Sequence, residues 1–385
     1  MHLKTEKTLI KKKQTTTKII RYIILIASLL FVAYKGYMHQ VLGGGSDGSP
    51  SIHALCPYGA LESFYLLFAQ GIFIEKIFSG TMVLLLITII LSIIFKRSFC
   101  GLICPFGALQ EFMSILGQKI FKKKFIMPDK IDKLLRYLKY FILLITAVFA
   151  WKTGELWMSS YDPWSAYAHM FGEFEEVIDE NLIGFIILII TLVGSILYDR
   201  FFCKYLCPMG AFLGIISKIS PNKIVKNKSK CINCKICSKK CPANINIAEL
   251  KEINSAECLN CQTCTLLCPI PGALENKQLK KTMTPIVLII SVITIYFGGI
   301  TVAKATNNYD LLPEPIEKGE IVNAEDIKGY MTLEEVSDYT GISLEELYEK
   351  LNLSKNIPSN IKMKSIKEYK PNFEVNQVRE LLLEK

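Results

Sequence analysis

Eight of the 13 cysteines fall in two runs of identical spacing. Each run has the form Cys-x2-Cys-x2-Cys-x3-Cys-Pro, and the two cover residues 231–242 and 258–269. Three cysteines in a tight turn bind three corners of one iron–sulfur cube, and the fourth binds the neighbouring cube. Zinc is less favoured because its sites usually pair two Cys-x2-Cys knuckles across a longer loop. The spacing predicts two [4Fe–4S] clusters, with the ligand sets Cys231, Cys234, Cys237 and Cys268, and Cys258, Cys261, Cys264 and Cys241.

A second pair of cysteine motifs follows two apolar stretches. Both have the form Arg-x-Phe-Cys-x3-Cys-Pro-x-Gly-Ala, beginning at Arg97 and Arg200. Positions i and i+4 share a helix face, so each motif is expected to present two thiols side by side. The proline should mark a break or a new helix start at the second cysteine. The four cysteines of the two motifs form a candidate further redox or metal site, whose chemistry the sequence leaves open: Cys100, Cys104, Cys203 and Cys207. The alternative is that each motif is a helix-ending turn with inert cysteines.

A third copy of this motif is degenerate. Cys56-Pro-Tyr-Gly59 repeats its second half, but Ile52 stands where the first cysteine would be. The pattern leaves open whether Cys56 is structural or functional. We expect it on the outer side of a membrane, before a short interfacial or re-entrant stretch at Phe64–Phe78.

The elements that must position these motifs are strongly apolar. The mean hydropathy is +0.31, and 51% of the residues are hydrophobic. Stretches of membrane-spanning type lie near residues 19–34, 82–95, 140–151, 182–197 and 285–303. These features predict a mainly α-helical integral membrane protein with about five transmembrane helices. Residues 19–219 form its membrane region, which precedes a bacterial-type 2[4Fe–4S] ferredoxin insert at 220–275 and the last span.

The net charge of +10 is unevenly distributed. Basic residues crowd the leader at 1–18, the loop at 96–136 and the ferredoxin insert, whereas the loop at 152–181 is acidic. By the positive-inside rule, the N-terminus and the ferredoxin insert are cytoplasmic and the C-terminus is extracytoplasmic. The predicted location is therefore the cell membrane, with several spans. Because membrane orientation accounts for the charge, no nucleic-acid partner is needed.

Two further segments carry weaker signals. Aromatic residues at Ser159–Phe174 indicate an interfacial belt, or alternatively the wall of a quinol site with His169 or Glu173 as proton acceptor. Residues 307–385 are charged and lack cysteine and histidine, which favours a small extracytoplasmic helical domain for docking or structure. Capping patterns at Thr332–Glu335 and Ser343–Glu346, separated by Gly341, predict two of its helices.

The order of these motifs resembles the NapH/NosR-type family of membrane-bound ferredoxin-like electron-transfer proteins. The likeness covers roughly Ile19–Ala303, from the paired Cys-x3-Cys-Pro motifs to the tandem ferredoxin runs. It implies electron exchange between cytoplasmic donors or the quinone pool and a membrane or extracytoplasmic acceptor. The chain lacks the long flavin-binding domain of NosR-type members and has no Cys-x2-Cys-His haem motif, so its organisation is closer to NapH.

The sequence thus predicts an iron–sulfur electron-transfer subunit rather than a stand-alone enzyme. The expected cofactors are the two cubes, with a third centre at the Cys-x3-Cys-Pro motifs and a quinone as further candidates. The lysines around the ferredoxin runs favour an acidic redox partner such as a ferredoxin or flavodoxin. Two alternatives are a redox sensor that signals through the C-terminal domain and an assembly factor for an extracytoplasmic metalloenzyme.

Overall fold

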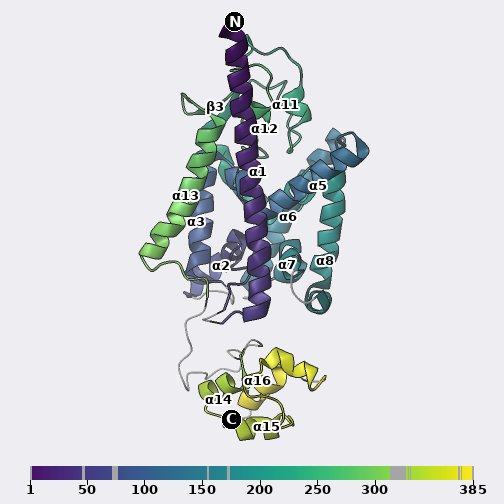
Figure 1. Ribbon diagram of the computed structural model, residues 1–385, viewed down its shortest axis with the longest axis vertical. Coiled ribbons are helices and arrows are strands. Elements are labelled where there is room, and N and C mark those ends of the chain that lie inside the picture. Colours follow the sequence, from purple (N-terminus) through teal and green to yellow (C-terminus); the bar gives the residue numbers. More distant parts are fainter. Residues whose placement is uncertain are drawn as a thin grey trace. The chain divides into compact units, whose positions relative to one another are not determined.

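The computed structural model is mainly helical and contains one small sheet (Figure 1). It divides into two units, one of residues 1–37 and 51–311 and the other of residues 38–50 and 312–385. Within them, the structure describes residues 2–45, 48–71, 77–153, 156–170, 174–312, 327, 329, 331–371, 373 and 375–383. Glu173 and part of the predicted Phe64–Phe78 stretch lie outside the described residues.

Three described helices are long and apolar enough to cross a membrane, at Lys12–Leu42, Asp129–Thr153 and Pro285–Ala305. They belong to α1 (His2–Leu42), α6 (Asp129–Thr153) and α13 (Pro285–Ala305). Aliphatic side chains on their surfaces, such as Leu30, Leu144 and Val302, are 62–65% exposed, as expected for lipid-facing positions. The chain is thus built as a membrane protein.

The other two predicted spans are also helical but shorter in their apolar part. They lie in α3 (Ser79–Phe95) and in the Leu182–Leu197 part of α8 (Phe174–Leu197). A count of five spans therefore remains a prediction.

Each of these two helices is followed by the same series of elements. After α3 come α4 (Ser98–Leu102) and α5 (Pro105–Phe121), and after α8 come α9 (Phe201–Tyr205) and α10 (Pro208–Ile216). The expected helix start at the second cysteine is confirmed, because Cys104 and Cys207 are N-caps with proline at the first helical position. The expectation of two thiols on one continuous helix is wrong, because α4 and α9 end before that cysteine.

The ferredoxin region is built on a four-stranded antiparallel sheet of order β2-β1-β3-β4. Ile224 on the central strand β1 pairs with Ile253 on β2 and Asn276 on β3. The short helices α11 and α12 each contain the third cysteine of a run, Cys237 and Cys264. The bounds are β1 Asn222–Lys226, α11 Ile236–Lys239, β2 Glu252–Ile253, α12 Thr263–Leu266, β3 Leu274–Gln278 and β4 Lys281–Met283.

The three lysine-rich segments meet at one end of the first unit. Gln14 of α1 lies 3.5 Å from the Cys268 carbonyl oxygen, and Lys124 and Arg136 donate hydrogen bonds to the carbonyls of Cys241 and Ala243. At the opposite end lie α2 (Pro57–Gln70) and α7 (Pro163–His169) (Figure 1). The side of the membrane on which each end lies remains a prediction.

The second unit contains α14 (Leu333–Thr340), α15 (Leu344–Lys350) and α16 (Val375–Leu383) around an apolar core that includes Leu347 and Phe373. The predicted capping box at Thr332 and Glu335 is confirmed. Ser343 also caps its helix, and Gly341 ends α14 with a φ of 70°.

Candidate metal centres

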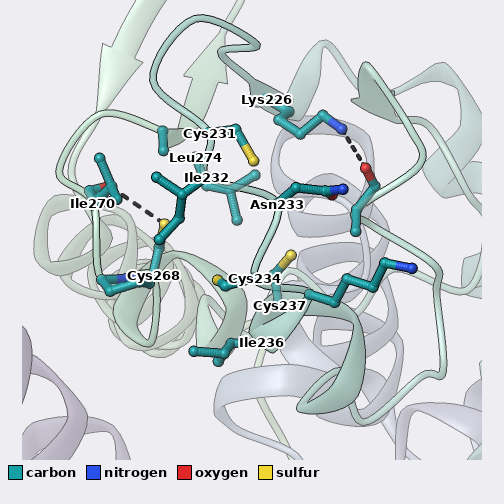
Figure 2. Close-up of a pocket in the computed structure, with 14 residues that line it drawn as sticks. Lys226, Cys231, Ile232, Asn233, Cys234, Ile236, Cys237, Cys268, Ile270 and Leu274 are labelled. Carbon is teal, nitrogen blue, oxygen red and sulfur yellow. Dashed lines mark hydrogen bonds between the residues drawn. The ribbon is translucent and has the colours of Figure 1, made fainter.

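The first predicted ligand set lines one pocket at the surface of the ferredoxin region (Figure 2). Cys268 meets the three cysteines of the other run there, as the crossed arrangement requires. Cys234 is exposed, and its neighbour Ile232 is 62% exposed. The set that we name the surface set is Cys231, Cys234, Cys237 and Cys268.

The second predicted set lines another pocket, and its four cysteines are only 6–8% exposed. Ile224, Ile245 and Ile253 pack around it and exclude water. The set that we name the buried set is Cys241, Cys258, Cys261 and Cys264.

Backbone geometry supports cluster binding at both sets. The residues on either side of the second cysteine of each run have positive φ. The angles are 55° and 59° at Asn233 and Lys235, and 48° and 60° at Asn260 and Gln262. Alternation of left- and right-handed residues forms concave nests of backbone N–H groups, which bind anions such as iron–sulfur clusters. Since all the described cysteines are free of disulfides, four thiols at each pocket fit a [4Fe–4S] cube. The assignment of these ligands remains a prediction.

The buried set lies directly against the first Cys-x3-Cys-Pro motif. A Cβ atom added to Gly101 would lie 2.4 Å from the Leu259 carbonyl oxygen and 3.1 Å from the Cys261 Cβ. Nearby, Asn260 donates a hydrogen bond of 2.8 Å to the carbonyl of Phe95 at the end of α3. Only glycine allows this approach of the two backbones.

The arginine of each Cys-x3-Cys-Pro motif packs against the other motif. The Nη1 atom of Arg200 lies 2.9 Å from the Cβ position of Gly107 and donates to the Cys100 carbonyl at 2.6 Å. Reciprocally, Arg97 Nη2 lies 2.7 Å from the Cβ position of Gly210. Each motif therefore places its arginine against the glycine of the other, so the two motifs form one site.

This packing brings Cys100, Cys104, Cys203 and Cys207, which we name the membrane-face cysteines, close to one another. Burial, and then Cys100 and Cys203, raise the pKa of the Cys104 thiol, and Cys207 interacts electrostatically with all three. The Gln110 amide donates to Cys203 Sγ at 3.2 Å, and the Gly210 N–H donates to Cys207 Sγ at 3.2 Å. In the described part of the chain, no three His, Cys, Asp or Glu side chains are grouped closely enough to hold a single metal ion.

Two buried ion-pair triads flank the four cysteines. Glu111 binds Arg21 and Arg200, each at 2.6 Å. Although burial alone would raise it, these two arginines hold the pKa of Glu111 at about 2. In the second triad, Glu257 binds Lys139 at 2.6 Å and Arg97 at 3.4 Å.

Burial alone would likewise raise the pKa of Glu257, but Arg97 and then Lys139 hold it below its ordinary value. Both carboxylates are therefore ionised at neutral pH. No sequence motif identifies Arg21, Glu111, Lys139 or Glu257 as a site residue. For Arg21, Glu111 and Lys139 the available signal was a charged residue at or within an apolar stretch, which is costly unless paired. Glu257 lies in the polar ferredoxin region, where the sequence offers no such signal.

Cys56 lies in the same apolar cores as two of the membrane-face cysteines. It is the N-cap of α2 and packs, with Cys104 and Cys207, against both cores. His169 lies at the end of α7, where its Nδ1 is 3.5 Å from Ser165 Oγ. The described residues thus group Cys56, but not His169, with the cysteine site.

Comparisons with known proteins point to the same regions. A family model described as a 4Fe-4S binding domain matches residues 80–124 and 180–227, which contain all four membrane-face cysteines. Another of the same description matches residues 224–245. No solved structure matches the chain.

Among curated proteins, the chain is 33% identical to the uncharacterized protein MJ0750 of Methanocaldococcus jannaschii, over 51% of this chain and 76% of that protein. It is 31% identical to the putative electron transport protein YccM of Escherichia coli, over 47% of this chain and 51% of YccM. The ferredoxin-type protein NapH of Haemophilus influenzae is also 31% identical, over 29% of this chain and 37% of NapH. The chain thus spans about half of YccM.

Proposed function

The chain belongs to the NapH-like family of ferredoxin-type 4Fe-4S proteins, and on that premise we propose that it relays single electrons between a soluble donor and a membrane or extracytoplasmic acceptor. Each bound cluster accepts or donates one electron at a time. The proposed route begins at the surface set, continues through the buried set and reaches the four membrane-face cysteines.

The contact at Gly101 is the observation that carries this proposal. The buried set includes Cys261, whose Cβ lies 3.1 Å from the Cβ position of Gly101, the residue directly after Cys100. Electron transfer slows steeply with distance, so direct packing of one cysteine set on the next favours transfer into the membrane region. A separate ferredoxin domain on a flexible tether would not need this packing.

The surface set provides a suitable entry point. Cys234 and Ile232 are exposed, so a partner's redox centre can approach the cluster closely. The exposed lysines around them are Lys228, Lys230, Lys235, Lys239 and Lys240. Their positive charge favours the approach of an acidic redox protein, such as a ferredoxin or flavodoxin, through electrostatic steering. On the membrane side, a quinone or an extracytoplasmic protein would receive the electrons.

Vesicles that contain the full chain and a trapped oxidant test this relay. With a reduced acidic ferredoxin outside, we expect many electrons per chain to reach trapped ferricyanide, and protein-free vesicles to show none. Cys258→Ser, which removes a ligand of the buried set, should stop transfer while the surface cluster still becomes reduced. One reduction per cluster without turnover would contradict a relay and would favour a redox sensor.

A further inference from the structure

The crossed arginines give the four membrane-face cysteines an unusual electrostatic environment. Each triad contains two cations and one carboxylate, so each carries a net charge of +1. The side chains of Arg21, Arg97, Lys139 and Arg200 are at most 2% exposed, so water does not screen them. A net positive charge buried in this way is strongly unfavourable unless an anion lies beside it.

The neighbouring ion pairs do not supply that anion. Asp132 is engaged by Arg136, Lys204 and the Tyr205 hydroxyl, and Asp199 by Lys124. Arg97 interacts electrostatically with Cys100, Cys207 and Cys203, and more weakly with Cys258 of the buried set. Arg200 interacts with Cys203 and, more weakly, with Cys261 of the buried set. The Arg97 triad thus interacts mainly with the membrane-face cysteines, whereas Arg21 and Arg200 of the other triad also interact with Cys261 of the buried set.

Buried arginine N–H groups without an acceptor also indicate an anionic partner at this site. In the described part of the chain, the Nε–H groups of Arg21, Arg97 and Arg200 are buried without a hydrogen-bond acceptor. Buried donors in folded proteins are nearly always paired, so three orphans in one site call for an explanation. An iron–sulfur cluster offers several acceptors at once, because its sulfides and thiolates both accept hydrogen bonds.

Three forms of the cysteines differ in charge. Four protonated thiols are neutral and so are two disulfides, and neither form offsets the buried cations. A cube in its oxidised state with four thiolates carries a net charge of about −2, which matches the two triads. We infer, on the basis of the proposed relay, that Cys100, Cys104, Cys203 and Cys207 hold a third [4Fe–4S] cluster whose charge is balanced by the crossed Arg97 and Arg200 triads.

The iron and acid-labile sulfide content per chain tests whether a third cluster is bound. After anaerobic purification and reconstitution, the full chain should hold about 12 irons, and Cys100→Ala/Cys203→Ala about eight. Cys56→Ala is the matched control, since it alters a cysteine of the same cores and should keep about 12. Retention of the ferredoxin EPR signals in every variant shows that folding is intact.

Charge variants test the role of the arginines as positioning residues. Arg97→Gln should shift the reduction potential of the third cluster to more negative values, or lose that cluster, without changing the signals of the cluster at the surface set. Arg97→Lys keeps the charge and should largely restore it. Equal spectra and iron content in both variants would contradict charge balancing.

The two proposals can fail separately. About eight irons in the reconstituted wild type, or zinc at the four cysteines, would overturn the third cluster even if electrons still reach trapped ferricyanide. About 12 irons without any electron transfer would overturn the relay and leave the third cluster intact.

Discussion

Gly101→Ala tests whether the buried set and the membrane motif act as one unit. The new Cβ would lie 2.4 Å from the Leu259 carbonyl oxygen, where normal contacts are about 3.5 Å, so the two backbones must separate by about 1 Å. Overpacking of this kind costs about 1–3 kcal/mol. Because Gly101 lies within α4, alanine would otherwise stabilise the helix by about 0.5–1 kcal/mol. We expect a net destabilisation of about 1–2 kcal/mol and slower electron transfer.

Gly298→Ala is the matched control, because this helical glycine of α13 has no atom of the described residues within 4 Å of its Cβ position. Thermal unfolding in detergent should show Gly101→Ala below the wild type and Gly298→Ala at or above it. Iron content should be unchanged in both, while ferricyanide reduction in vesicles slows only in Gly101→Ala. Equal stability and equal rates for the two variants would refute the proposed junction.

Three further predictions concern other parts of the chain. Glu111→Gln leaves Arg21 and Arg200 without their carboxylate and should cost about 3 kcal/mol or more, measured as a fall in Tm at neutral pH. Because the folded pKa of Glu111 is lowered to about 2, this stabilisation is fully present above about pH 4.5 and lost as the pH falls toward 2, so the Tm difference should narrow in acid. Ile232→Glu at the surface set should raise the KM for an acidic ferredoxin several-fold with unchanged iron content; an unchanged KM would place the entry point elsewhere. Thr332→Ala removes a capping box and should lower the stability of the C-terminal unit by about 1 kcal/mol, followed by hydrogen exchange of α14.

Local rules made much of this fold predictable. The proline after Cys104 and Cys207 fixes the start of a helix, and Gly341 ends one, because each depends on backbone geometry within a few residues. The five apolar stretches are helical for a similarly local reason. By contrast, the prediction of two thiols on one helix face was wrong, since it ignored that α4 ends at Leu102.

Tertiary features of the site could not be predicted in this way. Glu111 follows Cys104 by seven residues, but its partners Arg21 and Arg200 are about 90 residues away in other elements. Nothing in the local sequence states that Arg97 packs against the glycine of the other motif. The duplication gave a hint, because an arginine and a glycine recur at matched positions in both copies. The role of this arginine and this glycine follows only from the contact between the two copies in the folded chain.

The degenerate third copy shows what each part of the motif contributes. It retains Cys56, Pro57 and Gly59, and it too starts a helix, so Cys-Pro-x-Gly alone is sufficient for that structural task. Ser49 stands where the arginine would be, and the Cβ position of Gly59 faces Ile77 at 2.6 Å instead of a guanidinium. Loss of the first cysteine and loss of the arginine thus occur together. If the arginines served only to pack the helices, the third copy would need one as much as the other two do. Their restriction to the copies with two cysteines ties the buried positive charge to the chemistry of those thiols.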